Sequence, residues 1–402
     1  MLEGNHGEYT NLERLSTNSS KYLVTMPYGI GDAVYLGLTA VDQILKNNPT
    51  AQVDVLCNPL QATILEDDPR ITPIIVPRDF SFTADRRTWY KIAIVTKLMR
   101  SALSTLREKE YAGVFPGSGA FGFLRALKAP IMTPRLNDIL RDYQTIRHFQ
   151  DAPASKEVRQ IVNRFFGDVL PAPDVTEATP LYIKISHYQE ARNILNETGD
   201  IQKHPKTILI SPDTASDATR PPTELLSSAL KKLMQQNPDA KVIILPSYTD
   251  NEASERLARS LIVDQEEFAE RIYALPAEPK YHLLTITALA DLCDVVITGD
   301  TGTMQLAASQ RRVIDQLGQQ VDNVAKNKRN TVAIFGATNP GLYGHPERMV
   351  IVGRGRKSQR RLIPGFFKEG YNPRGRDFFD HIHSDELVST VNTILSPRKE
   401  PI

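Results

Sequence analysis

The sequence predicts an α/β protein made of two doubly wound domains that face each other across a cleft. Three observations support this fold class. Short apolar runs alternate with amphipathic helical patterns along most of the 402 residues, a length typical of two domains. Several of the runs are continuously apolar, as in parallel strands that are covered on both faces. One polar, turn-rich segment near the middle, Asn196–Pro205 (NETGDIQKHP), interrupts the alternation.

We take this polar segment as the linker between the domains. It separates an N-terminal domain over 21–195 from a C-terminal domain over 206–375, and 376–402 form a closing helix and tail. Residues 1–20 are polar, so we expect them to form a flexible tail.

The expected strands are short apolar segments that lie between helical patterns. In the first half they are Tyr22–Met26, Gln52–Cys57, Thr72–Val76, Ala112–Phe115 and Pro130–Met132. In the second half they are Thr207–Ser211, Lys241–Leu245, Arg271–Ala274, Asp294–Thr298, Thr331–Phe335 and Met349–Val352.

Helical periodicity follows three of the polar loops. One helix begins after Asp32 and ends at Asn47-Asn48-Pro49, a second begins after Pro222 and ends at Asn237-Pro238, and a third begins after Gly302. The apolar positions of the first fall at i, i+4, i+7 and i+11, namely Val34, Leu38, Val41 and Leu45. The polar stretch Gln310–Asn330 is long for a connection, and we expect either a helix extension or a surface excursion there.

Composition excludes several classes of protein. The net charge of +1 lacks the basic excess of a nucleic-acid-binding protein. No apolar run is long enough to span a membrane, and 1–20 lack the apolar core of a signal peptide, so we expect a cytoplasmic protein. The basic segment Arg354–Arg361 is interpreted as a solvated loop in preference to an anion contact, and peripheral membrane contact is left open. Cys57 and Cys293 lie near strand ends without zinc-site spacing, and we expect both to be reduced and partly buried.

Ligands of open α/β sheets bind beyond the carboxyl ends of the strands, so loops that follow strands are the candidate sites. The first is PYGIGDAV, Pro27–Val34. Gly29 and Gly31 allow a positive φ or a close backbone approach. Asp32 is read either as a helix N-cap or as a general base presented into the cleft. The loop does not match the G-x-G-x-x-G pattern of a dinucleotide site, because Val34 occupies the last position.

The second loop is SPDTASDATRPP, which runs from Ser211 to Pro222. This loop offers several groups that suit a diphosphate. They are the hydroxyls of Thr214, Ser216 and Thr219, the guanidinium of Arg220, and the main-chain amides at the start of the next helix. An evenly weighted alternative is a capped loop with a surface arginine.

Two further loops carry acidic residues after a strand. Glu252, in PSYTDNEASERLA, is read as a ribose contact or, at least as readily, as a helix cap or dipole contact. In ITGDTGTMQLAAS, the N–H groups from Thr301 to Gln305 would form an anion site at a helix N-terminus, with Asp300 as a cap or as a group that orients loop donors.

Two Asp-Thr-small triplets also resemble the dyad of an aspartic protease, Asp213-Thr214-Ala215 and Asp300-Thr301-Gly302. Both stand at strand-to-helix junctions, whereas the aspartic-protease fold is nearly all β. We therefore do not favour proteolysis.

With these loops aligned, the chain resembles the heptosyltransferase-like glycosyltransferases, glycosyltransferase family 9, which have the GT-B fold of two Rossmann-like domains. The resemblance covers roughly Lys21 to Leu395. It is most specific in ADLCDVVITGDTGTMQLAAS, similar to the family's D-[ST]-G-x-x-H-x-A donor segment, and in TVAIFGATNPGLYGHP, similar to its G-x-T-x-P segment. GIGDAVYLGLTAVDQILKNNP resembles the opening G-D-x-[LV] helix, EYAGVFPGSG occupies the place of Y-D-x-V-I-D-L-Q-G, and IHSDELVSTVNTIL is similar to the closing helix.

The resemblance implies an enzyme that transfers a sugar, heptose or another, from a nucleotide-sugar with inversion. The donor would bind the C-terminal domain and the acceptor the N-terminal domain. It implies Asp32 as the general base and favours this role over a cap. The donor-binding residues are then Thr214, Ser216, Arg220, Glu252, Asp300, Thr301, Gly302, Thr303 and Gln305. The acceptor-side loop residues are Gly29, Gly31, Gly117 and Ser118.

We expect no metal or other cofactor, because no Asp-x-Asp metal motif is visible. Charge on the leaving diphosphate would fall to Arg220, hydroxyls and helix N-termini. The expected partners are a nucleotide-sugar, with an ADP linkage favoured, and a glycan, lipid-linked or small-molecule acceptor.

The sequence departs from the family pattern in three places, and these departures affect the expected identity of the donor more than the expected fold. Gln305 replaces the family's histidine, and glutamine donates hydrogen bonds but cannot become cationic. Thr219-Arg220-Pro221-Pro222 stands where the family has Lys-x-Trp-Pro, so that Arg220 would substitute for the lysine. The stretch Gln310–Asn330 is the third departure. Two alternatives stay open: a GT-B-like sugar-nucleotide epimerase, and a family member that binds a nucleotide or glycan without turnover.

Overall fold

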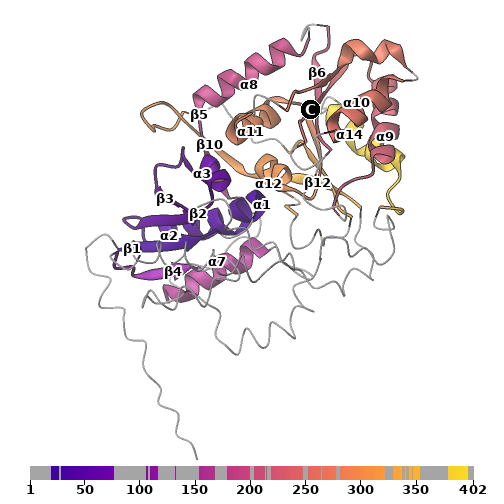
Figure 1. Cartoon of the computed structure of the whole chain (residues 1–402). Helices are drawn as coiled ribbons and strands as arrows, with labels where there is room; N and C mark the ends of the chain where they lie inside the picture. The colour runs from indigo at the N-terminus through magenta and orange to yellow at the C-terminus, as the bar shows by residue number, and fades with distance from the viewer. Residues whose placement is uncertain are drawn as a thin grey trace, which may run out of the picture.

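The structure of the chain is a computed structural model. It describes residues 20–26, 29–76, 106, 109–115, 132, 154–167, 179–199, 203–212, 214, 219–247, 252–263, 265–277, 281–321, 329–336, 340, 344–345, 347–353 and 379–396. Within these ranges the chain forms two larger parallel sheets with packed helices, and one two-stranded sheet (Figure 1). The predicted α/β class with doubly wound parallel sheets is confirmed.

The N-terminal sheet is drawn in indigo and purple in Figure 1. Its strands are β1 (Lys21–Thr25), β2 (Gln52–Cys57), β3 (Ile71–Ile75) and β4 (Gly113–Phe115), all parallel, in the order β3-β2-β1-β4. Its helical segments are α1 (Ile30–Asp32), the π-helical η2 (Ala33–Leu38), α2 (Thr39–Asn47), α3 (Pro59–Leu65) and α7 (Ala154–Phe165). Because the chain runs outward over β2 and β3 and returns to β4, the order reverses between β1 and β4.

The C-terminal sheet repeats this topology with two more strands. Its strands are β6 (Lys206–Ser211), β7 (Ala240–Ile244), β8 (Ile272–Ala274), β9 (Val295–Gly299), β11 (Thr331–Ile334) and β12 (Met349–Val352). They are parallel and ordered β12-β11-β9-β6-β7-β8, the doubly wound order in which direction reverses between the first and fourth strands. Its helical segments are α9 (Thr223–Gln236), α10 (Ala253–Ile262), the 3₁₀ segment η4 (Glu266–Arg271), α11 (Leu283–Leu292), α12 (Gly302–Ala308) and α14 (Ser384–Leu395).

The third sheet was not predicted. Strand β5 (Pro180–Lys184) pairs in parallel with β10 (Gln310–Ile314), and α8 (Ile185–Glu197) follows β5 directly and packs against α11. The beginning of the Gln310–Asn330 stretch is therefore a strand, so both expectations for these first residues, a helix extension and a surface excursion, are wrong. Residues 322–328 lie outside the described part of the chain.

Strand β6 shows why the strands in the second half of the chain have continuously apolar sequences. Ile208 and Ile210 belong to one hydrophobic cluster and Leu209 to another, and all three side chains are fully buried. Neighbouring residues of a strand point to opposite faces, so both faces of this sheet are covered. The predicted strands agree with the observed ones to within one residue at each end, apart from Pro130–Met132, of which only Met132 is described.

The predicted helices also lie where expected. Val34, Leu38 and Val41 are buried, and the two Asn-Pro pairs follow the last residues of α2 and α9. Both cysteines are free and buried, Cys57 at the end of β2 and Cys293 just before β9. Most of the predicted N-terminal tail and all of Arg354–Arg361 lie outside the described residues.

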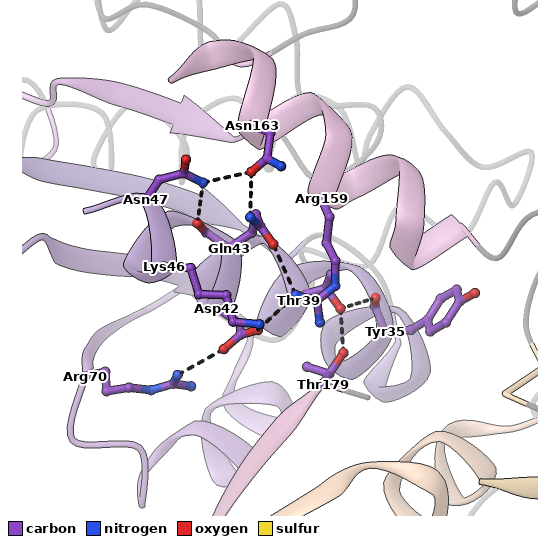
Figure 2. A network of polar contacts seen from close by, with 10 residues as sticks. All are labelled: Tyr35, Thr39, Asp42, Gln43, Lys46, Asn47, Arg70, Arg159, Asn163 and Thr179. Atoms are coloured by element: carbon purple, nitrogen blue, oxygen red, sulfur yellow. Dashed lines mark hydrogen bonds and ion pairs between the residues drawn. The ribbon is translucent and has the colours of Figure 1, made fainter. Parts of the chain in front are cut away.

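A buried polar network fixes the helix that follows β1. Arg159 of α7, 1% exposed, lies 3.0 Å from Asp42 Oδ2 and donates to Gln43 Oε1 of α2 at 3.2 Å (Figure 2). Asn47 Nδ2 donates to Asn163 Oδ1 at 2.9 Å, so a second pair joins the same two helices. Buried hydrogen bonds between the two helices make this packing arrangement more favourable than alternatives that would break them.

The network also reaches the π-helical segment. The Thr39 hydroxyl donates to the backbone oxygen of Tyr35 at 2.8 Å and contacts the hydroxyl of Thr179, just before β5 (Figure 2). The segment α1–η2–α2 is therefore held from α7 and from the start of β5. This matters because its first turn is the loop that we predicted as a site.

Candidate functional site

The predicted loops follow strands that flank the two points where strand order reverses. The Gly29–Asp32 loop follows β1, the Thr214 loop follows β6 and the Asp300 loop follows β9. These are the positions at which doubly wound sheets bind ligands. Gly117 and Ser118 come shortly after β4, but they lie outside the described residues, as does Ser216.

Two of these loops, one from each domain, contact each other. A Cβ atom built on Gly302 would lie 3.0 Å from Ile30 Cβ and 3.3 Å from the Gly31 nitrogen. A Cβ atom on Gly31 would lie 3.6 Å from Gly302 Cα. Glycines at both positions allow α1 and the start of α12 to touch through their backbones, as the adjacent ribbons in Figure 1 show. Gly29 differs, since its φ is −66° and nothing lies within 4 Å of a built Cβ.

Asp32 ends α1 beside this contact, and its side chain is outside the described part of the structure. The N-cap position of α1 is Gly29, so the interpretation of Asp32 as an N-cap is wrong. The role of Asp32 as a base stays a prediction.

A second contact brings the Thr214 loop against the end of β9. A Cβ atom built on Gly299 would lie 2.8 Å from Pro221 Cδ, 2.8 Å from the Thr219 oxygen and 3.0 Å from Thr214 Cγ2. Because two of these atoms belong to a backbone carbonyl and a rigid ring, only glycine fits at position 299. The two loops of the C-terminal domain that were predicted to hold a diphosphate therefore lie side by side.

Hydrogen bonds give the Thr214 loop its shape. The Thr219 hydroxyl donates to the buried Thr214 hydroxyl at 2.9 Å, and an Arg220 Nη2–H donates to the Thr214 oxygen at 3.1 Å. The Arg220 guanidinium is thereby anchored to the backbone of this loop. This arrangement holds a cation and two hydroxyls next to β9.

Thr301 caps the helix that begins at Gly302. Its hydroxyl accepts the Met304 N–H at 3.3 Å and lies 3.3 Å from the Thr298 hydroxyl. The cap is therefore Thr301, and the capping alternative for Asp300 is wrong. Thr303 follows within the first turn, and both Asp300 and Thr303 are half-buried. Their donor-loop roles stay predictions.

Gln305 is buried and points to a residue that was not predicted. Its Oε1 lies 3.2 Å from Nε2 of His345, and both side chains are less than a tenth exposed. The His345 ring packs edge-on against Tyr35 of η2, with centroids 4.9 Å apart. The available signal for His345 was its place in GLYGHP, within a segment that the resemblance had already singled out.

Glu252 lies apart from these contacts. It occupies the N-cap position of α10, makes no side-chain cap hydrogen bond, and its side chain is 72% exposed beside Arg256. The capping interpretation of this side chain is wrong, and its ribose contact stays a prediction.

A second polar group joins the domains at the ends of α3, α8 and α11. Glu66 Oε1 lies 3.0 Å from His282 Nε2, and Asp67 Oδ2 lies 3.3 Å from His187 Nε2. The two histidine rings stack with centroids 4.6 Å apart. Lys184 Nζ lies 2.8 Å from Asp67 Oδ1, which completes a cluster of two carboxylates and three basic side chains.

This cluster has metal-ligating residue types but poor metal geometry. His282 Nδ1 accepts the Leu284 N–H at 3.2 Å, which leaves the proton of a neutral ring on Nε2, the atom next to Glu66. Burial lowers the pKa of His282, which favours this neutral form. A metal lies in the plane of each imidazole that ligates it, whereas these rings stack with only 19° between their planes. We therefore read the cluster as a structural polar contact in which Asp67 pairs with Lys184 and His187, while Glu66 and His282 link the two domains.

Within the residues that the structure describes, no helix combines the length and apolar character needed to cross a bilayer.

No protein-family model matches the sequence, and no curated protein matches it either. Solved structures do match. ADP-heptose lps heptosyltransferase II of E. coli is 18% identical with a TM-score of 0.61, over 93% of this chain and 98% of that one. A glycosyl transferase of family 9 from Veillonella parvula is 15% identical with a TM-score of 0.64, over 94% and 97%. Heptosyltransferase WaaC of E. coli, solved with ADP, is 15% identical with a TM-score of 0.55, over 93% and 99%. The chain thus has the two-domain fold of these glycosyltransferases along nearly its whole length.

Proposed function

We propose that the protein is a glycosyltransferase that moves a sugar, heptose or another, from a nucleotide-sugar to an acceptor hydroxyl. One observation carries the proposal: the loop that bears Asp32 touches the start of α12 at Gly31 and Gly302. A reaction that joins a donor on one domain to an acceptor on the other needs such a meeting of loops. The fold supports the proposal, since the heptosyltransferases described above share it.

We assign the donor to the C-terminal domain. The N–H groups at the start of α12 and the adjacent loop with Thr214, Thr219 and Arg220 together form a setting suited to a diphosphate. Ser216, Asp300 and Thr303 complete the proposed donor loops, and Glu252 is proposed to contact the ribose. An ADP-linked sugar is the favoured donor, because WaaC was solved with ADP.

In the proposed reaction Asp32 takes the proton of the acceptor hydroxyl. The acceptor oxygen attacks the anomeric carbon from the face opposite the diphosphate, the bond to the diphosphate oxygen breaks, and the product has the inverted configuration. The nucleoside diphosphate leaves with an additional negative charge. Arg220 and the helix N-terminus are proposed to stabilise this charge without a metal.

A donor screen tests the proposal. Nucleoside diphosphates and nucleotide-sugars are added to the protein one at a time, and the unfolding temperature is recorded. A ligand that binds the native state raises the unfolding temperature. Each donor that binds is then incubated with candidate acceptors, with wild type and with Asp32→Asn. Transfer that Asp32→Asn abolishes while binding persists supports the proposal. Conversion of the donor without an acceptor would show an epimerase, and binding without turnover a non-enzymatic protein.

A further inference from the structure

Gln305 stands where the family pattern that this sequence resembles has a histidine, and the structure brings another histidine to it. His345 follows β11 in the chain and lies 40 residues beyond Gln305, yet its ring meets the Gln305 amide. Both side chains are buried, so water does not compete for this contact.

The chemistry of the two groups fixes the direction of the bond. An amide oxygen has no proton, so His345 Nε2–H donates to Gln305 Oε1, at 3.2 Å. The other ring nitrogen, Nδ1, lies 3.4 Å from Glu347 Oε1, a buried oxygen without a hydrogen-bond partner among the described residues. The ring thus lies between a carboxylate and an amide.

The same pair rests on the helix that carries Asp32. A Cβ atom on Gly31 would lie 3.6 Å from Gln305 Cγ, and Tyr35 packs its ring against His345. Gly31 and Tyr35 are four residues apart, close to one helical turn, so they lie near each other on one side of the α1–η2 segment. Gln305 and His345 therefore contact this segment side by side.

We propose that His345 is a positioning residue for sugar transfer, acting through Gln305. By holding Oε1, it turns the Gln305 amide nitrogen away from itself and toward the donor loop. The proposal rests on the proposed function. It accounts for how a donor segment without its histidine keeps an oriented N–H donor.

The test compares substitutions at His345. His345→Leu removes the N–H donor and replaces the ring with a slightly shorter, apolar side chain. His345→Gln keeps an N–H near the position of Nε2. We expect His345→Leu to lower kcat/KM for the donor roughly 10- to 100-fold with the acceptor KM unchanged, and His345→Gln to recover most of this loss.

The same leucine substitution at the exposed His383, at the start of α14, is the matched control and should leave activity unchanged. If His345→Leu does not fold, His345→Asn replaces it, because its amide reaches only to the position of Nδ1.

A double-mutant cycle with Gln305→Ala separates positioning from packing. If His345 acts through Gln305, His345→Leu causes little further loss of donor kcat/KM in the Gln305→Ala background. Equal losses for His345→Leu and His345→Gln, or additive losses in the cycle, overturn the inference and leave the proposed function intact. A wild-type protein that turns over no nucleotide-sugar overturns the proposed function, and the inference with it.

Discussion

Gly302 and Gly31 define the smallest feature on which the proposed site depends. Neither has a side chain, and their backbones meet between the two domains. The role of Gly31 in a close approach was one of two alternatives that the sequence allowed. The partner of that approach could not be predicted, because no local pattern indicates which of two loops far apart in the chain will touch.

We predict that Gly302→Ala lowers the rate of transfer by roughly 10- to 100-fold, since a small displacement of reacting groups has effects of that size. The added methyl would lie 3.0 Å from Ile30 Cβ and would push α1 away from α12. Initial rates with a saturating donor measure the effect.

Gly29→Ala is the matched control in the neighbouring loop. Its backbone is extended and nothing lies within 4 Å of the new methyl, so its rate should equal that of wild type. Equal rates for Gly302→Ala and wild type would show that the loop contact has no part in catalysis.

Helix caps illustrate what local sequence leaves undecided. An acidic residue beside a helix start was read as a cap at Asp32 and at Asp300, and each time a neighbouring residue holds the N-cap position, Gly29 in one case and Thr301 in the other. A shift of one to three residues in a helix start is beyond what composition can resolve.

At the scale of elements, α7 packs against the helical segment α1–η2–α2, which carries Asp32, the proposed base. Arg159 is fully buried and pairs with Asp42, so its removal leaves a buried carboxylate with weaker partners and opens a cavity. We predict that Arg159→Ala lowers the free energy of unfolding by about 3 kcal/mol. Urea unfolding followed by circular dichroism measures the loss.

Arg164→Ala serves as the control on the same helix. Arg164 is exposed, and we expect a change below about 0.5 kcal/mol. Similar losses for the two variants would mean that the buried network contributes nothing specific.

The two missed strands differ in how well their sequences show burial. The runs of β6, β7 and β9 are apolar because both faces of their sheet are covered. In contrast, β10 reads QRRVI, and its buried Arg311 donates to the backbone oxygens of Ala307 and Ser309, four and two residues earlier. With two charged residues among five, β10 has no continuous apolar signature. Its partner β5, PLYIK, does carry an apolar run and was missed all the same.

At the scale of the whole molecule, the carboxylates at the end of α3 contact the starts of α8 and α11: Asp67 pairs with Lys184 and His187, and Glu66 with His282. Burial alone would raise the pKa of Asp67, but hydrogen bonds from His187 and Lys184 outweigh it and lower the pKa to about 2, against an ordinary value of 3.8. The charged form is therefore favoured in the folded state. Its stabilisation is present above the unfolded pKa and is lost as the pH falls toward the folded one.

We predict that Asp67→Asn lowers the free energy of unfolding by about 2 kcal/mol near neutral pH, and that the difference from wild type shrinks between about pH 4 and pH 2. Urea unfolding at a series of pH values tests this. Asp239→Asn, in a partly exposed pair with Lys206, is the control and should cost below about 1 kcal/mol. A difference that stays constant with pH would mean that the charge of Asp67 is not what stabilises the contact.

The two-domain topology itself was predictable, because alternation of apolar runs and amphipathic helices requires parallel sheets. What could not be predicted is which distant residues meet. The Gly31–Gly302 contact, the Glu66–His282 contact and the β5–β10 pairing join the two domains, and His345 approaches Gln305 within the C-terminal domain. The proposed site consists largely of such contacts.

The most direct test of the central claim is proton NMR of one reaction containing protein, a nucleotide-sugar that binds and its acceptor. We predict release of the nucleoside diphosphate together with a glycoside whose anomeric proton has the configuration opposite to that of the donor, and no product with Asp32→Asn. A product that retains the donor configuration, or undiminished transfer by Asp32→Asn, would contradict the account.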